Sequence, residues 1–216
     1  MRALEGTRRP GLVGRLALLV VGCAVLAAPV GAASADGVVL HGVMVDRDPF
    51  EASAKTRAFP VTVYLKGAAS RVDFKGPAGE RGMLLDNGDG ERWLLAVDQG
   101  AAVPVPSGGL GSLRLDPDAP CRGIKGRCEP TRRRFLAGVN AEGWRYRGAD
   151  GSGPAGTSDG EFWIDPQRGL LLAWEGRKRG RDESYRFHAD QFSHEPLPDV
   201  LFQLPESAAL PGGDAS

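Results

Sequence analysis

Short runs of alternating apolar and polar residues follow one another along most of the chain. The clearest run is VTVYLKG at residues 61–67, in which Val61, Val63 and Leu65 share one face of a strand and polar residues occupy the other. This period of two is typical of strands with one buried face. After the first 35 residues, no stretch sustains the period of a helix. The pattern predicts a mainly β protein with about nine to eleven short antiparallel strands.

Tight turns separate these runs. DNGDG at residues 86–90 lies between RGMLLD and ERWLLAVD, and its Asn-Gly and Asp-Gly pairs favour the positive φ angles of a hairpin turn. A calcium loop is the functional alternative, but the spacing of the carboxylates does not fit an EF-hand. AAVPVP at residues 101–106 is typical of an edge strand, because proline cannot donate to a sheet ladder. Three more strands follow between residues 158 and 195, and LFQLP closes the pattern.

Residues 107–134 interrupt the strand pattern with Gly, Pro and charged side chains. Long loops in compact domains are often lids or partner surfaces, so we expect this insertion, as a loop or a short helix, to cover part of the sheet. Cys121 and Cys128 lie within it and are predicted to form a disulfide, because a metal site would need further ligands that are not nearby in sequence. The run Arg132–Arg134 has two interpretations: a site that contacts an acidic lipid headgroup or an acidic partner, or a solvated strand entry.

The first 35 residues have the three parts of an export signal. A basic start is followed by an apolar run from Leu16 to Leu26 and by the small-residue site Ala33-Ser34-Ala35. We predict a periplasmic protein cleaved after Ala35. The alternative is a membrane-anchored lipoprotein, because VVGC ending at Cys23 has the general form of a lipobox.

Charge and composition exclude one class of partner and suggest a source. The whole chain has 27 basic and 27 acidic residues, and the signal contains four Arg and one Glu, so the remainder is slightly acidic. A nucleic-acid binder would show a concentrated positive excess, and we predict no nucleic-acid partner. Arginine greatly outnumbers lysine, as in GC-rich bacterial coding. We therefore expect a bacterial envelope protein.

Candidate catalytic and metal-binding residues do not form a recognisable constellation. The three histidines, His41, His188 and His194, have no metal or catalytic spacing, and the nucleophile elbow G-x-S-x-G is absent from the sequence. Most Asp residues lie in turns, where local backbone hydrogen bonds explain them. The interpretation is a protein that is not an enzyme, with no catalytic residues, metal or cofactor.

Four segments resemble the LolA/LolB-like superfamily, in particular its outer-membrane-lipoprotein-sorting-like branch. They are VYLKGAASRVDFK, DNGDGERWLLAVDQGAAV, EFWIDPQRGLLLAWE and LPDVLFQLPES, in this order along the chain. The match covers roughly residues 37–206, nearly all of a predicted domain from 36 to 206, and leaves 207–216 as a predicted disordered tail. The residues that carry the motifs are Asp89, Gly90, Trp93, Trp163, Asp165, Gly169 and Leu170.

The resemblance implies a strongly curved antiparallel half-barrel with an apolar concave side. In the carrier members of the superfamily, this side holds the acyl chains of lipoproteins. The chain departs from the carriers in having no helix before its first strand and no evident helical lid, whose place residues 107–134 would take. Trp174, which shares a face with Leu170 and Leu172, is expected in the lining. The predicted apolar lining is Val63, Leu65, Phe74, Trp93, Leu95, Phe162, Leu172, Trp174 and Phe187.

Three functional hypotheses follow, of which the last, an enzyme of an unrecognised type, would require carboxylates or histidines that converge on a cavity. The first is a monomeric envelope protein that binds a lipid, a lipoprotein acyl chain or another apolar ligand in the concavity. The second is an accessory subunit whose concavity is filled by its own side chains and which contacts another envelope protein. An open apolar volume inside the sheet would favour the first hypothesis.

Overall fold

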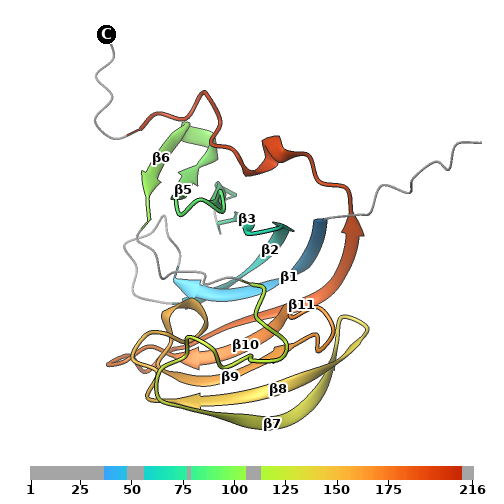
Figure 1. Ribbon diagram of the computed structural model, residues 1–216. Coiled ribbons are helices and arrows are strands. Elements are labelled where there is room, and N and C mark those ends of the chain that lie inside the picture. The colour runs from blue at the N-terminus through green and yellow to red at the C-terminus, as the bar shows by residue number, and fades with distance from the viewer. Residues whose placement is uncertain (1–36, 48–55, 77–78, 106–112, 211–216) are drawn as a thin grey trace, which may run out of the picture. The chain divides into compact units, whose positions relative to one another are not determined.

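The computed structural model describes residues 37–47, 56–76, 79–105 and 113–210. They form a single antiparallel sheet of eleven strands in the order β6-β5-β4-β3-β2-β1-β11-β10-β9-β8-β7, shown in Figure 1. The strands are β1 (Gly37–Arg47), β2 (Thr56–Lys66), β3 (Ala69–Lys75), β4 (Arg81–Asp86), β5 (Arg92–Ala96), β6 (Ala101–Pro104), β7 (Arg127–Leu136), β8 (Val139–Arg147), β9 (Asp159–Ile164), β10 (Leu171–Arg177) and β11 (Ser184–Glu195).

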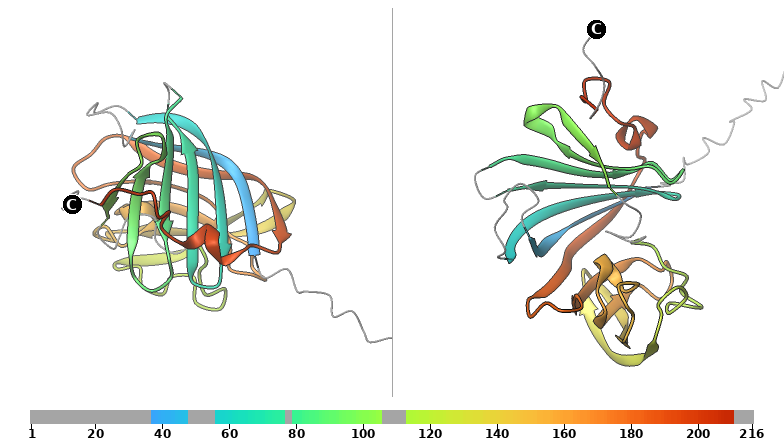
Figure 2. Two further views of the ribbon diagram at one scale, coloured as in Figure 1. Left: turned by 90° about the horizontal axis from the view of Figure 1, so that it is seen from above. Right: turned by 90° about the vertical axis from the view of Figure 1, so that its left-hand side faces the viewer.

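The sheet is curved and is not closed, with β6 at one edge and β7 at the other; Figure 2 shows the curvature from two directions. In the described ranges, the helical elements are three short 3-10 helices, η1 (Val97–Gln99), η2 (Pro154–Gly156) and η3 (Asp199–Phe202). The prediction of a curved antiparallel half-barrel is therefore confirmed, and so is the edge position of β6.

The sheet consists of two meanders joined through β1 and β11. Strands β1 to β6 pair in chain order, as do β7 to β11. The joint runs from the pair Gly37 and Glu195 to the pair Val45 and Arg186, with a bulge after His41. The bulge inserts one extra residue into β11 and increases the local twist. The two meanders can therefore bend towards each other at this joint.

Local turn chemistry fixes the hairpin registers. Ala137 and Gly138 link β7 to β8, and both have positive φ, as a two-residue type I′ turn requires. In the DNGDG segment, the Asn87 side chain accepts hydrogen bonds from the backbone N–H groups of Asp89 and Glu91. No metal-binding group of three or more His, Cys, Asp or Glu exists among the described residues. The interpretation of DNGDG as a plain turn agrees with these bonds.

One face of the sheet, which we call the inner face, carries the main core. Apolar residues of β1 to β3 pack in the same cluster as those of β9 to β11. Strands so far apart in the sheet order share a cluster only because the sheet curves around this face. Its largest fully buried members include Trp174, Tyr146, Tyr185, Phe162 and Phe187.

The opposite face, the outer face, carries a second core on the β1 to β6 half. Val39, Met83, Leu85 and Leu95 are buried there beneath the chain that follows β11. We call residues 197–209 the C-terminal strap. Lys66 Nζ donates a hydrogen bond to the carbonyl of Leu197 at 2.7 Å. At its other end, the strap joins the sheet edge through a parallel bridge.

That bridge pairs Ala209 with Ala101 of β6. The Ala102 N–H donates to the Ala209 carbonyl at 3.0 Å, and the Ala209 N–H donates to the Gly100 carbonyl at 2.6 Å. The prediction of a disordered tail from residue 207 is thus wrong up to residue 210, because these residues satisfy the edge of β6. Residues 211–216 lie outside the described residues.

The insertion predicted at 107–134 is shorter than expected. Residues 113–126 form a loop without a helix, but β7 begins at Arg127. The strand was hidden because Arg132, Arg133 and Arg134 leave no apolar alternation to detect. Two of these arginines serve the fold: Arg134 stacks over the Trp163 ring at 3.7 Å, and Arg133 pairs with Glu142 at 2.7 Å.

The strap supplies a first prediction. Phe202 is 5% exposed in the outer core, so replacing it with alanine removes its buried surface and leaves a cavity. Phe202→Ala should lower the free energy of unfolding by about 3 to 5 kcal/mol, measured by chemical denaturation. Val200 is in the same 3-10 helix but is 67% exposed, and Val200→Ala should change the stability by less than about 0.5 kcal/mol. Equal effects of the two changes would show that the strap does not cover a core.

Candidate functional site

The nine residues predicted to line the concavity divide between the two faces. Trp93 and Leu95 lie on the outer face and belong to the second core under the strap. Their assignment to the lining is wrong, because both faces of β5 are apolar and alternation alone does not show which one is concave. The other seven belong to the inner-face core or pack against it: Val63, Leu65, Phe74, Phe162, Leu172, Trp174 and Phe187.

An open apolar pocket of about 270 Å³ lies on the inner face of the first meander. Phe74 is the one predicted residue in its wall, and the other predicted inner-face residues are packed in the core beside it. Its lining is mostly apolar, as in typical sites for small apolar ligands. The wall residues are Met44, Phe59, Val61, Val72, Phe74, Leu84, Leu94, Val105 and Ala155, with Asp46, Arg47 and Lys178 among them.

Strand register explains why these side chains meet. Val72 pairs with Leu84, and Leu84 pairs with Leu94, so one row of aliphatic side chains crosses three strands. Phe59 and Phe74 add two rings whose centres are 5.7 Å apart. Alternation within β2 and β3 could have identified Val61 and Val72. Leu84 and Leu94 stand within continuous apolar runs, MLL and WLLA, so their face could not be assigned from sequence.

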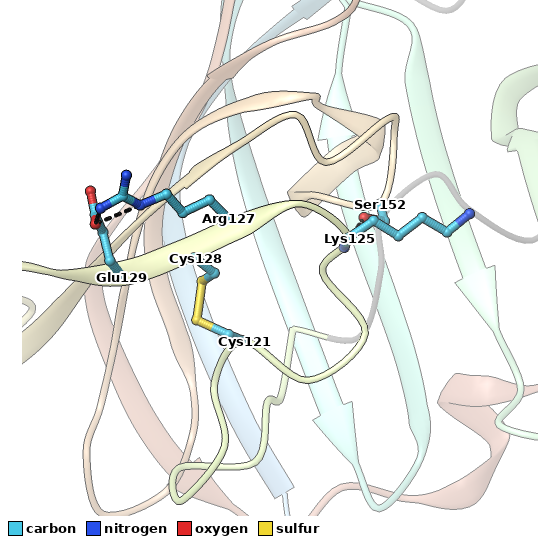
Figure 3. Close-up of a disulfide and its surroundings, with 6 residues drawn as sticks. All are labelled: Cys121, Lys125, Arg127, Cys128, Glu129 and Ser152. Carbon is cyan, nitrogen blue, oxygen red and sulfur yellow. Dashed lines mark hydrogen bonds and ion pairs between the residues drawn. A yellow bond between two sulfur atoms is a disulfide. The ribbon is translucent and has the colours of Figure 1, made fainter.

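The disulfide loop covers another part of the inner face. Cys121 and Cys128 are bonded, with Cα atoms 5.9 Å apart, which confirms the predicted pair. Figure 3 shows this bond and the neighbouring hydrogen bond from the Lys125 N–H to Ser152 Oγ, which is 2.7 Å long. A second hollow of about 280 Å³ lies between this loop and Trp174. The expected lid is therefore a loop, and it lies over the second meander.

A larger hollow, of about 830 Å³, is charged. It lies along β7 to β11 and is lined by five arginines and four acidic residues. Its side chains include cross-strand ion pairs, such as Arg145 with Glu161 at 2.6 Å. No sequence signal pointed to it, because the charges come from four strands. Its mixed charge and polar walls make it unsuited to an apolar ligand.

Tyr146 of β8 is fully buried within the second meander. A Cβ atom at Gly160 or Gly176 would approach its hydroxyl to 2.6 or 2.5 Å, so both glycines are needed for its ring to pack. Its hydroxyl hydrogen-bonds Thr157 Oγ1. Thr157 donates its own proton to the Pro154 carbonyl, so Tyr146 is the donor. Burial raises the pKa of Tyr146 to about 12.

The histidines lie apart and have structural contacts. His41 Nδ1 lies 3.2 Å from Thr62 Oγ1, His188 lies 3.6 Å from Asp190, and His194 packs edge-on to Phe192. None of the three lines the apolar pocket. The pocket thus presents no histidine for acid–base chemistry.

Comparison with known proteins gives a likeness of fold. No protein-family model matches the chain, and no curated protein matches it. An uncharacterized conserved protein from Thermus thermophilus has 13% sequence identity and a TM-score of 0.52, over 82% of this chain and 90% of that chain. The chain thus shares its fold with that protein.

Two further solved structures are similar at lower TM-scores. The MucA/MucB complex of Pseudomonas aeruginosa has 15% identity and a TM-score of 0.45 over 81% of this chain, which spans 59% of that one. A LolA superfamily protein from Nitrosomonas europaea has 14% identity and a TM-score of 0.35, over 78% of this chain and 90% of that chain. The sheet of this chain is curved, open and antiparallel, which is the fold expected from its sequence.

Among the described residues, none of the helical segments is long and apolar enough to cross a bilayer. Residues 1–36, with the predicted cleavage site and Cys23, lie outside the described ranges.

Tyr146 supplies a prediction for alkaline pH. Below its ordinary pKa of 10, Tyr146 is protonated in both the folded and unfolded states. Between pH 10 and about 12 the unfolded chain loses this proton first, so the free energy of unfolding should fall as pH rises, by roughly 2 to 3 kcal/mol in all. Tyr146→Phe removes the titrating group and should flatten this slope in denaturation curves. If the free energy of unfolding fell equally steeply with pH in the wild type and in Tyr146→Phe, the raised pKa would not belong to Tyr146.

Proposed function

We propose that the chain binds an apolar ligand, of the size of an acyl chain, in the pocket on the inner face. One observation carries the proposal: beside the inner-face core, the described residues leave an open volume with a mostly apolar wall. Exposed apolar surface of this kind is unfavourable in water, and a ligand that covers it gains about 0.8 kcal/mol for each buried methylene group. The resemblance to carriers of acyl chains supports the same ligand class.

The proposal describes a binding protein and not an enzyme. Among the described residues, the pocket wall contains one carboxylate, Asp46, and no histidine or cysteine. The side chain of Asp46 is engaged by the backbone N–H of Arg47 at 2.7 Å. The Asp46 carboxylate and its backbone partner are better suited to the polar rim of a binding pocket than to a pair of catalytic residues.

An accessory subunit of an envelope complex is the second candidate. Phe135 is 77% exposed near the end of β7, and β7 is an edge of the sheet. An edge strand with an exposed aromatic residue is suited to contact another protein. Under this alternative, the inner pocket would have no ligand, so the binding experiment below decides between the two.

The pocket can be tested with a fluorescent fatty acid and the protein that begins at Asp36. We expect saturable binding, and lipid that co-purifies should appear in native mass spectra. Leu84→Gln places an amide in the pocket wall and should weaken binding about tenfold or more, since an unpaired polar group there costs roughly 1 to 3 kcal/mol.

Val103 provides a matched control for this change. It pairs with Leu94 in the same cross-strand row, but it is 47% exposed and does not line the pocket. Val103→Gln should leave the affinity unchanged. Absence of both saturable binding and co-purified lipid would refute the proposed function and favour the accessory subunit.

We propose in addition that the protein acts in the periplasm, as a monomer, after removal of residues 1–35. A disulfide at Cys121 and Cys128 suits an oxidising compartment. Intact-mass measurement of the protein isolated from the envelope tests this point. We expect a chain that starts at Asp36. A lipid-modified chain that starts at Cys23 would contradict this proposal and support the membrane-anchored alternative.

A further inference from the structure

The apolar pocket has one polar end. Its charged wall residues are Asp46 and Arg47, which end β1, and Lys178, which directly follows β10. Both strands are antiparallel to β11. They therefore run in the same direction, and their C-terminal ends lie on the same side of the sheet. The wall therefore brings two cationic side chains together beside an otherwise apolar volume.

We infer that this polar end binds an oxyanion, so that the ligand is an amphiphile with a carboxylate or phosphate head group. The inference rests on the proposed function, because the apolar tail is the part that occupies the pocket. Arg47 and Lys178 are the residues that bind the head group. A guanidinium can bind a carboxylate or phosphate through two parallel hydrogen bonds, and an ammonium group binds these anions as a point charge.

Arg47 has donor capacity left over. Its Nε is buried, with no hydrogen-bond partner among the described residues. One of its terminal nitrogens lies 3.5 Å from Glu183, longer than the ~2.7 to 2.9 Å of a strong charge-assisted bond. A guanidinium carries several donors in one plane, and a buried donor without an acceptor is costly. An oxyanion of the ligand would satisfy these donors.

Lys178 also has a cationic group that can bind an anion. Its ammonium group lies 4.3 Å from the centre of the Tyr185 ring, and within the described part of the chain no carboxylate pairs with it. The Tyr185 side chain is fully buried, and its hydroxyl has no hydrogen-bond partner among the described residues. The aromatic ring positions the ammonium group without neutralising it. Its charge therefore remains available to a ligand.

The two nearby acids do not cancel this preference. Asp46 accepts a hydrogen bond from the backbone of its neighbour Arg47. Within the described ranges, the ion pair of Glu183 is the long contact with Arg47 at 3.5 Å. Glu183 is thus a weak competitor for the guanidinium, which a closer oxyanion would displace. Removing its charge should strengthen the binding of an anion, whereas removing either cation should weaken it.

The test compares four probes at concentrations below micelle formation: dodecanoate, dodecyl phosphate, dodecanol, and inorganic phosphate with no chain. Calorimetry on the protein that begins at Asp36 should show that one or both anionic amphiphiles bind at least about tenfold more tightly than dodecanol, a difference of roughly 1.4 kcal/mol. Inorganic phosphate should not bind measurably, because it has no tail. The relative affinities of the two anionic probes identify the head group.

Three variants assign the preference to these residues. Arg47→Gln and Lys178→Gln should each reduce the preference for the anionic probe about fivefold or more, while leaving the affinity for dodecanol within about twofold. Glu183→Gln should increase the preference, so the inference can still be judged if Arg47→Gln is unstable. Arg179→Gln is the matched control, because Arg179 follows Lys178 but is exposed and pairs with Asp150.

The outcomes separate the inference from the proposed function. If dodecanol binds as tightly as both anions, or if the variants weaken all probes equally, the head-group site is refuted and the apolar pocket stands. If no amphiphile binds, the proposed function itself is refuted. Binding of inorganic phosphate alone would also overturn the inference, since it would show an anion site independent of the pocket.

Discussion

The ladder between β1 and β11 is the interaction on which the rest of the molecule depends. It joins two meanders, within which the strands pair in chain order. It also aligns β1 and β10 so that their C-terminal ends lie on the same side of the sheet. Close backbone packing maintains it: a Cβ atom at Gly42 would lie 2.1 Å from the carbonyl oxygen of His188. Because the sheet bends at this joint, side chains of both meanders form one core and leave a pocket beside it.

Both faces of the first meander are apolar, and each is covered differently. The outer face is covered by the C-terminal strap, which packs Phe202 and its neighbours on Met83 and Leu85. The inner face of the same strands is only partly covered, where Ala155 of η2 reaches the pocket wall. The second meander is the reverse, with an apolar inner face under the disulfide loop and charged residues outside. The described residues of the first meander therefore leave an open apolar surface on its inner face.

Much of the fold was predictable from sequence, because the alternation in VTVYLKG and the turn residues at Asn87 to Gly90 are local signals. The disulfide followed from compartment and spacing. The site was predictable only in part. Trp93 and Leu95 alternate as well as any inner residues, but the strap that covers them is more than a hundred residues away in the chain. Arg47 and Lys178 meet through strand pairing, and nothing in their own sequence neighbourhoods shows it.

The separation of β1 and β11 along the chain also sets the order in which the protein can fold. The strand nearest the amino terminus, which begins at Gly37, has its second partner at residues 186–195. That ladder cannot form until almost the whole chain is available, and contacts of such high sequence separation slow folding because loop closure precedes their gain. Until β11 is available, the first meander leaves one side of β1 without a hydrogen-bonded partner strand. During this interval the unpaired backbone of β1 is accessible and prone to aggregation. It is therefore the strand that a chaperone would most usefully protect.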